Sequence, residues 1–181
     1  VSDRTFPTNP MGGKYTPGVG FRPEILSALP SSPRRVLDLG CGSGGLAAGL
    51  PGVEVVGVES VPSAAEGARR HCARVHVLDL DRDEVPEPDG SFDALVYADV
   101  LEHLRDPWKA LARHRRLLSP SGRVVASVPN AQHWRISLGL LAGRWTYLDP
   151  DGLGHILARD HLRFFTLREL HGALEGVGYR V

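Results

Sequence analysis

The stretch Val36-Leu37-Asp38-Leu39-Gly40-Cys41-Gly42-Ser43-Gly44-Gly45 joins a short apolar run to a glycine-rich turn. The apolar run predicts a buried strand, and glycines directly after a strand let the backbone turn tightly and approach a ligand. Taken alone, the pattern also fits a dinucleotide site, because Gly40, Gly42 and Gly45 satisfy G-x-G-x-x-G. Glu59, further along, suits a ribose in either case, so the stretch predicts a nucleotide-binding α/β fold without choosing the ligand.

Asp38 favours one of these ligands. It lies two residues before the first glycine, where the phosphates of a dinucleotide would approach and a carboxylate would repel them. The same charge attracts an ammonium or a sulfonium, and S-adenosylmethionine carries both cations and no phosphate. We therefore expect S-adenosylmethionine at this turn. A purely structural turn carboxylate is the alternative for Asp38.

Apolar runs and helical patterns alternate along the rest of the chain. Nearly continuous apolar runs are typical of strands buried on both faces of a parallel sheet. The alternation predicts an α/β fold with a doubly wound, mostly parallel sheet and a ligand beyond the carboxyl ends of its strands. Strands are expected at 35–39, 53–58, 74–78, 92–97 and 123–128, and helices at 23–29, 44–50, 62–73 and 106–118.

The helix expected at 106–118 has the clearest signals. Asp106 is the expected N-cap, with Pro107 at the first helical position. Trp108, Leu111 and Leu118 are expected on one apolar stripe.

Together these motifs resemble the class I S-adenosylmethionine-dependent methyltransferases. The resemblance covers about residues 22–181 and implies a Rossmann-like fold with S-adenosyl-L-methionine as the methyl donor. The last strands of that fold would follow Val181, so we expect the sequence to be a fragment of a longer polypeptide. The further motifs are Leu78-Asp79-Leu80, Asp89-Gly90-Ser91-Phe92-Asp93, Asp99-Val100-Leu101-Glu102-His103-Leu104 and Leu118-Ser119-Pro120-Ser121-Gly122.

The resemblance implies positions for the methionine part of the cofactor. Asp38 and the backbone at Gly40 and Gly42, with Cys41 between them, would hold its charged end. After the fourth strand, Ala98 and Asp99 would lie along the same moiety.

It also implies positions for the nucleoside. Glu59 would chelate both ribose hydroxyls, with Ser60 beside it. Asp79 would accept from the adenine amino group, and Leu80 would lie at the ring. For Asp79 a solvated loop acid is the alternative, because further acidic residues follow it.

Candidate catalytic residues follow the fourth and fifth strands. Methyl transfer from a sulfonium is an in-line displacement, so the protein must mainly align a nucleophile and manage its proton. A hydroxyl nucleophile usually needs a general base or a metal. His103, His133 and Glu102 are the candidate catalytic residues, with either histidine as the base.

The pattern Asp99-x-x-Glu102-His103 also raises the question of a metal. It resembles an element that binds a divalent metal in some relatives, among them quinone-biosynthesis O-methyltransferases and small-RNA 2′-O-methyltransferases. His133, His155 or His161 would have to supply the partner histidine. Glu-His-Leu also occurs in metal-free methyltransferases of this type. We therefore expect a metal-free reaction and assign no metal ligand, with a divalent metal as the alternative.

The chain divides into an arm and a domain. Residues 1–33, rich in Pro and Gly, are expected to form an arm ending in a short helix, and 34–181 the methyltransferase domain. Residues 131–165 form a long connection at the strand tips and are expected to build a substrate lid, a packed structural cap being the alternative. The run 130–168 resembles methyltransferases of glycan clusters, some of them fused to glycosyltransferase domains.

The composition of the chain limits the classes of partner that we expect. The chain of 181 residues is 42% hydrophobic, and its 21 basic and 21 acidic residues give a formal charge of zero. This balance gives no general attraction to nucleic acid or an anionic membrane. No apolar run is long enough to cross a bilayer, and the polar first residues lack a signal-peptide core. Two cysteines without metal spacing, Cys41 and Cys72, complete the prediction of a reduced, cytoplasmic protein.

The leading functional prediction is O-methylation of a small molecule or a glycan. One alternative is a metal-dependent methyltransferase acting on an RNA 3′-terminal 2′-hydroxyl, which the neutral charge disfavours. A dinucleotide oxidoreductase and a non-catalytic nucleotide-binding scaffold are the others. The identity of the acceptor and the oligomeric state are left open.

Overall fold

The computed structural model describes residues 23–143 and 160–181. Most of the expected arm at 1–33 lies outside the described residues, as does the middle of the insertion expected at 131–165, with Trp145, Tyr147 and His155. The arm and the lid therefore stay predictions.

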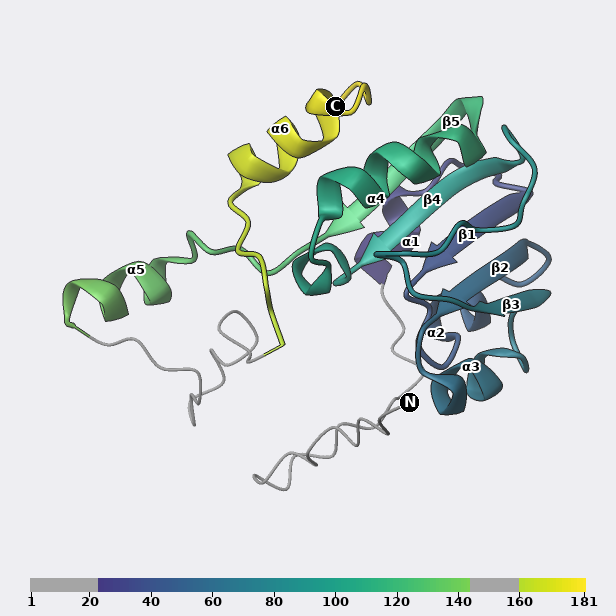
Figure 1. Ribbon diagram of the computed structural model, residues 1–181, viewed down its shortest axis with the longest axis horizontal. Coiled ribbons are helices and arrows are strands. Elements are labelled where there is room, and N and C mark those ends of the chain that lie inside the picture. The colour runs from purple at the N-terminus through teal and green to yellow at the C-terminus, as the bar shows by residue number, and fades with distance from the viewer. Residues whose placement is uncertain (1–22, 144–159) are drawn as a thin grey trace.

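The described residues form one parallel sheet. Its strands are β1 (Arg35–Leu39), β2 (Glu54–Glu59), β3 (Arg74–Val77), β4 (Phe92–Ala98) and β5 (Leu118–Ser127). They lie in the order β3-β2-β1-β4-β5, and every neighbouring pair is parallel (Figure 1). This confirms the doubly wound α/β prediction. The strand order reverses beside β1, so the crevice expected for a ligand lies at the carboxyl ends of β1 and β4.

Helices cover both faces of the sheet. They are α1 (Pro23–Ala28), α2 (Gly45–Ala48), α3 (Pro62–Ala68), α4 (Pro107–His114) and α6 (Leu167–Gly176); a further helix, α5 (Trp134–Leu141), follows β5. Residues of α1, α2 and α3 form one buried cluster with Val36 of β1. Residues of α4 and α6 form the other with Leu37 and Leu39 (Figure 1). Successive side chains of one strand thus point to opposite cores, as in a sheet buried on both faces.

Two helices end a full turn or more before the sequence pattern predicts. Helix α3 stops at Ala68 instead of residue 73. The Ala73 amide then donates to the carbonyl of Val55 at 2.8 Å, directly before β3 begins. Helix α4 ends at His114, and the short turn η2 (Arg115–Leu117) leads directly into β5.

The stripe expected on α4 is wrong at two of its three positions. Leu118 is the first residue of β5 and pairs with Phe92 of β4, so it is not helical. Trp108 is 44% exposed, whereas Leu111 is fully buried as expected. The expected N-cap is confirmed, because the Asp106 carboxylate accepts from the Lys109 amide at 2.9 Å.

A buried carboxylate joins the strands at their amino ends. The side chain of Glu87 is fully buried, and its oxygens contact Arg35 at 2.7 Å, Arg74 at 2.8 Å and His76 at 2.8 Å. These partners come from β1 and β3, and Arg116 donates to the Glu87 carbonyl at 3.0 Å. The network ties four separate segments together at the edge of the sheet opposite the ligand crevice.

The connection after β5 leaves and returns at the same place. Asn130 and Phe165 form an isolated parallel bridge, and the Ala131 amide donates to the Phe165 carbonyl at 2.9 Å. Between them, α5 lies apart from the sheet (Figure 1) and exposes Trp134, Leu138 and Leu141. No helix in the described ranges is both long enough and apolar enough to cross a membrane.

Candidate functional site

The glycine-rich turn after β1 is fastened to the end of β2. The amides of Gly40 and Cys41 both donate to the Val58 carbonyl, at 2.8 and 3.0 Å. The Gly42 amide donates to Oε2 of Glu59 at 2.9 Å. Gly40 has a φ of +79°, and a Cβ there would lie 2.4 Å from Cγ2 of Val100. Only glycine suits both the backbone angle and this close approach.

A cavity of about 130 Å³ opens beside this turn. Among the residues that line it are five that the sequence predicts as cofactor-binding: Asp38, Gly40, Cys41, Gly42 and Ala98. Ile25 of α1 and Leu46 of α2 add apolar walls. The cavity thus lies at the carboxyl ends of β1 and β4, where the sheet topology predicts a ligand.

Asp38 brings a buried acid to this cavity. Its side chain is 3% exposed, and burial, followed by the charge of Glu59, raises the pKa of Asp38 to about 7. Burial in a low-dielectric surrounding disfavours the charged form of a carboxyl group. A cationic ligand in the cavity would offset that penalty and favour the ionised carboxylate.

Glu59 ends β2 and faces the same turn. Besides the Gly42 amide, its carboxylate accepts from the Val61 amide at 2.8 Å and from the hydroxyl of Ser60 at 3.4 Å. Ser60 itself is exposed. The acid predicted to hold the ribose therefore joins the turns that follow β1 and β2, and it does not itself line the cavity.

Asp79 and Leu80 follow β3. Asp79 is half-buried; one of its carboxylate oxygens accepts from the Asp81 amide at 2.9 Å, and the other lies 3.6 Å from Nε of Arg82. Leu80 is 8% exposed and belongs to the core on the α4 side. The Asp79 carboxylate thus closes its own turn through the Asp81 amide, and adenine recognition by Asp79 and Leu80 stays a prediction.

Asp99 has an unusual backbone at the end of β4. Its φ of +55° is the single left-handed value of a non-glycine residue in the ranges described above. Asp99 Oδ1 accepts from the Ser127 hydroxyl at 2.9 Å, and the Asp99 amide donates to the Ser127 carbonyl at 3.1 Å. Such conformations cost energy and tend to cluster at functional sites.

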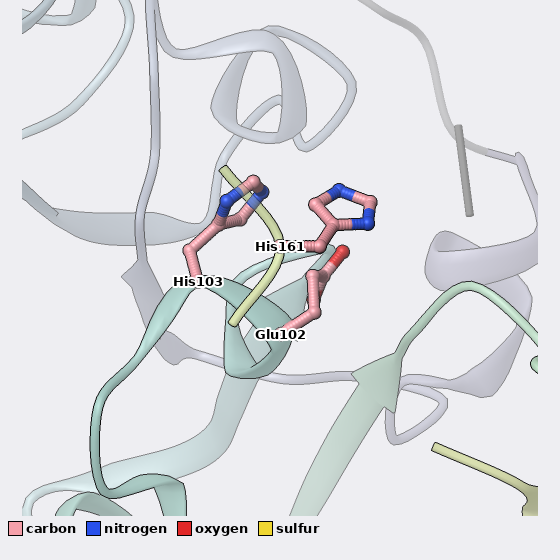
Figure 2. A group of neighbouring side chains, drawn as sticks. All are labelled: Glu102, His103 and His161. Carbon is pink, nitrogen blue, oxygen red and sulfur yellow. The ribbon is translucent and has the colours of Figure 1, made fainter. Parts of the chain in front are cut away.

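Glu102, His103 and His161 come together after β4. Each offers one ligand atom, and these atoms all lie within 4.8 Å of one another. Figure 2 shows Glu102 and His103 rising from the turn η1 (Leu101–His103), with His161 reaching them from the segment that leads to Phe165. The rings of His103 and His161 meet edge to face at 4.7 Å between centroids. Glu102 is 1% exposed.

The partner of His103 sets its tautomer. Nδ1 of His103 lies 3.2 Å from the backbone carbonyl of Asp160, which can only accept, so Nδ1 carries the proton. Nε2 is then the nitrogen with a lone pair, the form that a general base or a metal ligand needs. The Asp160 carboxylate also lies 3.5 Å from Nδ1.

The other predicted base, His133, does not belong to this group. It precedes α5, and its ring lies 5.9 Å from that of Trp134. Its buried Nδ1 has no hydrogen-bond partner among the described residues. Of the three histidines considered as metal partners, the structure brings His161 to Glu102 and His103, while His155 lies outside the described residues.

One carboxylate and two imidazoles form a donor set that divalent metals accept. The Asp160 carbonyl is the kind of second partner that commonly orients a metal-bound imidazole. A divalent metal would therefore be sought at Glu102, His103 and His161.

Two contacts near the site could not be predicted from the sequence. The sequence spacing does not predict that Asp160 lies beside His103, because His103 follows β4 and Asp160 belongs to the connection after β5. Nor does it bring Cys72 to Cys41. The one signal in the sequence is Gly57, a glycine inside the Val-rich strand β2, which marks a close approach of other atoms.

Comparison with known proteins places this geometry in a family. The family model described as "Methyltransferase domain" matches residues 20–181. A demethylmenaquinone methyltransferase of Thermus thermophilus is 41% identical over 58% of the chain and 51% of its own length. A ubiquinone biosynthesis O-methyltransferase of Cereibacter sphaeroides is 27% identical over 87% of the chain and 65% of its own length. The chain thus spans about half to two thirds of these relatives.

Solved structures show the same fold. A methyltransferase of Thermotoga maritima, described as a possible histamine N-methyltransferase, superposes with a TM-score of 0.68 at 22% identity, over 87% of this chain and 69% of its own. The plantazolicin methyltransferase, solved with S-adenosylhomocysteine, gives 0.63 at 18% identity, over 86% and 59% of the two chains. The family match and the parallel sheet agree, and the chain belongs to the class I S-adenosylmethionine-dependent methyltransferases.

Proposed function

We propose that this chain transfers the methyl group of S-adenosylmethionine to an oxygen of a small molecule. The observation that carries the proposal is the cavity at the carboxyl ends of β1 and β4, with the buried acid Asp38 in its wall. A buried carboxylate favours an ammonium or sulfonium and disfavours a phosphate, which supports the methyl donor over a dinucleotide.

A quinol or another phenol is the first acceptor class to test. Two of the relatives carry names of quinone-pathway enzymes, and one of those names specifies O-methylation. A glycan hydroxyl is the second class, because the sequence after β5 resembles methyltransferases of glycan clusters. Both acceptors need a group that takes the hydroxyl proton as the methyl group arrives.

His103 is the group that we propose as the base. Its Nδ1 donates to the Asp160 carbonyl, so Nε2 is left to accept a proton. Glu102 lies beside it, buried. His133 remains the second candidate base.

Calorimetry of the purified chain tests the donor. We expect S-adenosylhomocysteine to bind and NAD not to bind, and the reverse order would contradict the proposal. Methyl transfer from labelled S-adenosylmethionine to a catechol, with an oligosaccharide tested in parallel, then decides the acceptor class. Elemental analysis of the same sample, with activity measured after chelation, tests the metal-dependent alternative.

Histidine variants test the base. His103→Ala should lose turnover while keeping its affinity for S-adenosylhomocysteine, because the imidazole does not line the cofactor cavity. His171→Ala, on the exposed side of α6, is the matched control and should keep both. Full turnover of His103→Ala, with turnover lost in His133→Ala, would transfer the role to His133.

A further inference from the structure

Two thiols from distant parts of the chain meet at one backbone position. Gly57 lies in the middle of β2, and a Cβ there would be 2.6 Å from Sγ of Cys41 and 3.3 Å from Sγ of Cys72. The missing side chain of Gly57 thus makes the space that both sulfurs share. Both cysteines are reduced and buried, with 7% and 8% of their surface exposed.

The two cysteines differ in what they are attached to. Cys41 lies inside the cofactor turn and lines the cavity, and its amide shares the Val58 carbonyl with Gly40. Cys72 follows α3, outside the cavity lining, where its amide donates to the Ala68 carbonyl at 2.9 Å. A bond between the sulfurs would therefore link the cofactor turn to the end of α3, which does not line the cavity.

The contact between the thiols also gives Cys41 and Cys72 different chemical roles. Hydrogen bonding with Cys72, followed by burial, raises the pKa of the Cys41 thiol. The same contact lowers the pKa of Cys72 and so favours its thiolate form, while the Cys41 thiol also donates to the Gly42 carbonyl at 3.8 Å. The thiolate is the form that reacts with oxidants, and oxidant-sensing cysteines commonly have a second cysteine beside them.

We propose that Cys41 and Cys72 are a thiol oxidation site for a peroxide, and that the disulfide formed there weakens cofactor binding. The Cys72 thiolate attacks one oxygen of hydrogen peroxide, which breaks the O–O bond, releases hydroxide and leaves a sulfenic acid. The Cys41 sulfur then attacks the Cys72 sulfur and displaces the hydroxyl group. Overall, two thiols and one peroxide give one disulfide and two waters.

The disulfide must change the turn. A disulfide holds its sulfurs about 2.05 Å apart with a restricted torsion angle, which draws Cys41 toward α3. Gly40 and Gly42 flank Cys41 and line the cavity with it, so the cavity changes shape. This effect rests on the proposed function, because it requires that the cavity hold the cofactor. A bound cofactor would hold the turn in its reduced arrangement, away from the geometry of the disulfide, and should therefore slow the oxidation.

The experiment treats the intact chain with hydrogen peroxide and follows mass and affinity together. We expect the mass to fall by about 2 Da and both thiols to disappear from a denaturing thiol assay. Calorimetry should show S-adenosylhomocysteine binding weakened about tenfold or more, restored by dithiothreitol. S-adenosylhomocysteine added before the peroxide should slow the loss of thiols.

Cys72→Ala is the control variant, because Cys72 does not line the cavity. It should bind S-adenosylhomocysteine as the reduced wild type does and keep that affinity after peroxide. If the protein gains the mass of oxygen and does not lose two hydrogens, no disulfide forms and the proposal is wrong. If the disulfide form binds S-adenosylhomocysteine as tightly as the reduced form, the proposed effect on binding is wrong. If the reduced chain does not bind S-adenosylhomocysteine, the proposed function fails along with that effect, while the mass still decides the disulfide.

Discussion

Glu59 holds the turns that follow β1 and β2 through the amides of Gly42 and Val61. We expect Glu59→Ala to weaken S-adenosylhomocysteine binding by about 1–3 kcal/mol, the usual cost of losing a charged hydrogen-bond partner. Calorimetry measures the change. Glu54→Ala, at the other end of the same strand, is the matched control. Equal affinities of both variants and the wild type would remove Glu59 from the cofactor site.

We expect Asp38 to make cofactor binding depend on pH. Burial first, and then Glu59, raise the pKa of Asp38 to about 7 in the free protein, whereas a bound cation requires the ionised carboxylate. We therefore expect S-adenosylmethionine to bind about tenfold more tightly at pH 8 than at pH 6. In Asp38→Asn the affinity should be lower and should not follow this slope. The same slope in the variant would assign the titration to another group.

At this scale the sequence predicts the residues of the turn better than the residues around it. The motif identifies Gly40 and Asp38 because backbone conformation and charge act locally. His161 is only one of three alternatives in the sequence, because its approach to Glu102 depends on the path of the chain after β5. The pairing of Cys41 with Cys72 depends on packing across β2, which no spacing encodes.

Helix α4 begins at a side-chain cap that can be tested alone. The Asp106 carboxylate accepts from the Lys109 amide, one of the donors that the first turn of a helix leaves without a partner. We expect Asp106→Ala to lower the free energy of unfolding by about 1 kcal/mol. Asp106→Asn should keep most of it, because asparagine caps equally well. Urea denaturation measures both, and equal losses in the two variants would contradict the cap.

Strand and helix positions follow from the apolar pattern, whereas their ends follow from hydrogen bonds. The strand expected at 35–39 is confirmed with the same bounds, because its apolar run stops at the first glycine. The strand expected at 123–128 begins at Leu118, since Leu118 pairs with Phe92 before a register shift in β4. Pairing partners far away in the sequence decide such ends, so local patterns miss them.

The stability of the whole sheet depends on a carboxylate far from the site. Glu87 joins Arg35, Arg74 and His76 with a fully buried side chain. We expect Glu87→Ala to cost about 3 kcal/mol of unfolding free energy, because the mostly buried guanidinium of Arg35 would lose a fully buried charged partner. Glu54→Ala removes an exposed contact of the same Arg35 and should cost at most about 1 kcal/mol. Similar midpoints for both variants in urea would contradict a structural role for the network.

Two buried groups oppose each other in the acid stability of the molecule. Burial, followed by Arg113 and Arg116, lowers the pKa of His114 to about 4, so His114 costs stability as the pH falls from about 6.5 to 4. Asp38, with its pKa raised to about 7, adds stability over nearly the same interval as it takes up its proton. We expect Asp38→Asn to lose thermal stability between pH 6.5 and pH 4.5 more steeply than the wild type, because the opposing contribution is gone. Parallel melting curves would contradict this balance.

The bridge between Asn130 and Phe165 makes the excursion that it closes a replaceable unit. A loop whose ends are already neighbours can grow or shrink at little cost, because closure entropy rises only slowly with length. Evolution can therefore exchange residues inside this excursion without re-registering a strand, provided that Asp160 and His161 keep their places beside His103. The same property allows the corresponding segment of a relative to be grafted between Asn130 and Phe165. Activity assays would then show whether the graft transfers the relative's acceptor preference.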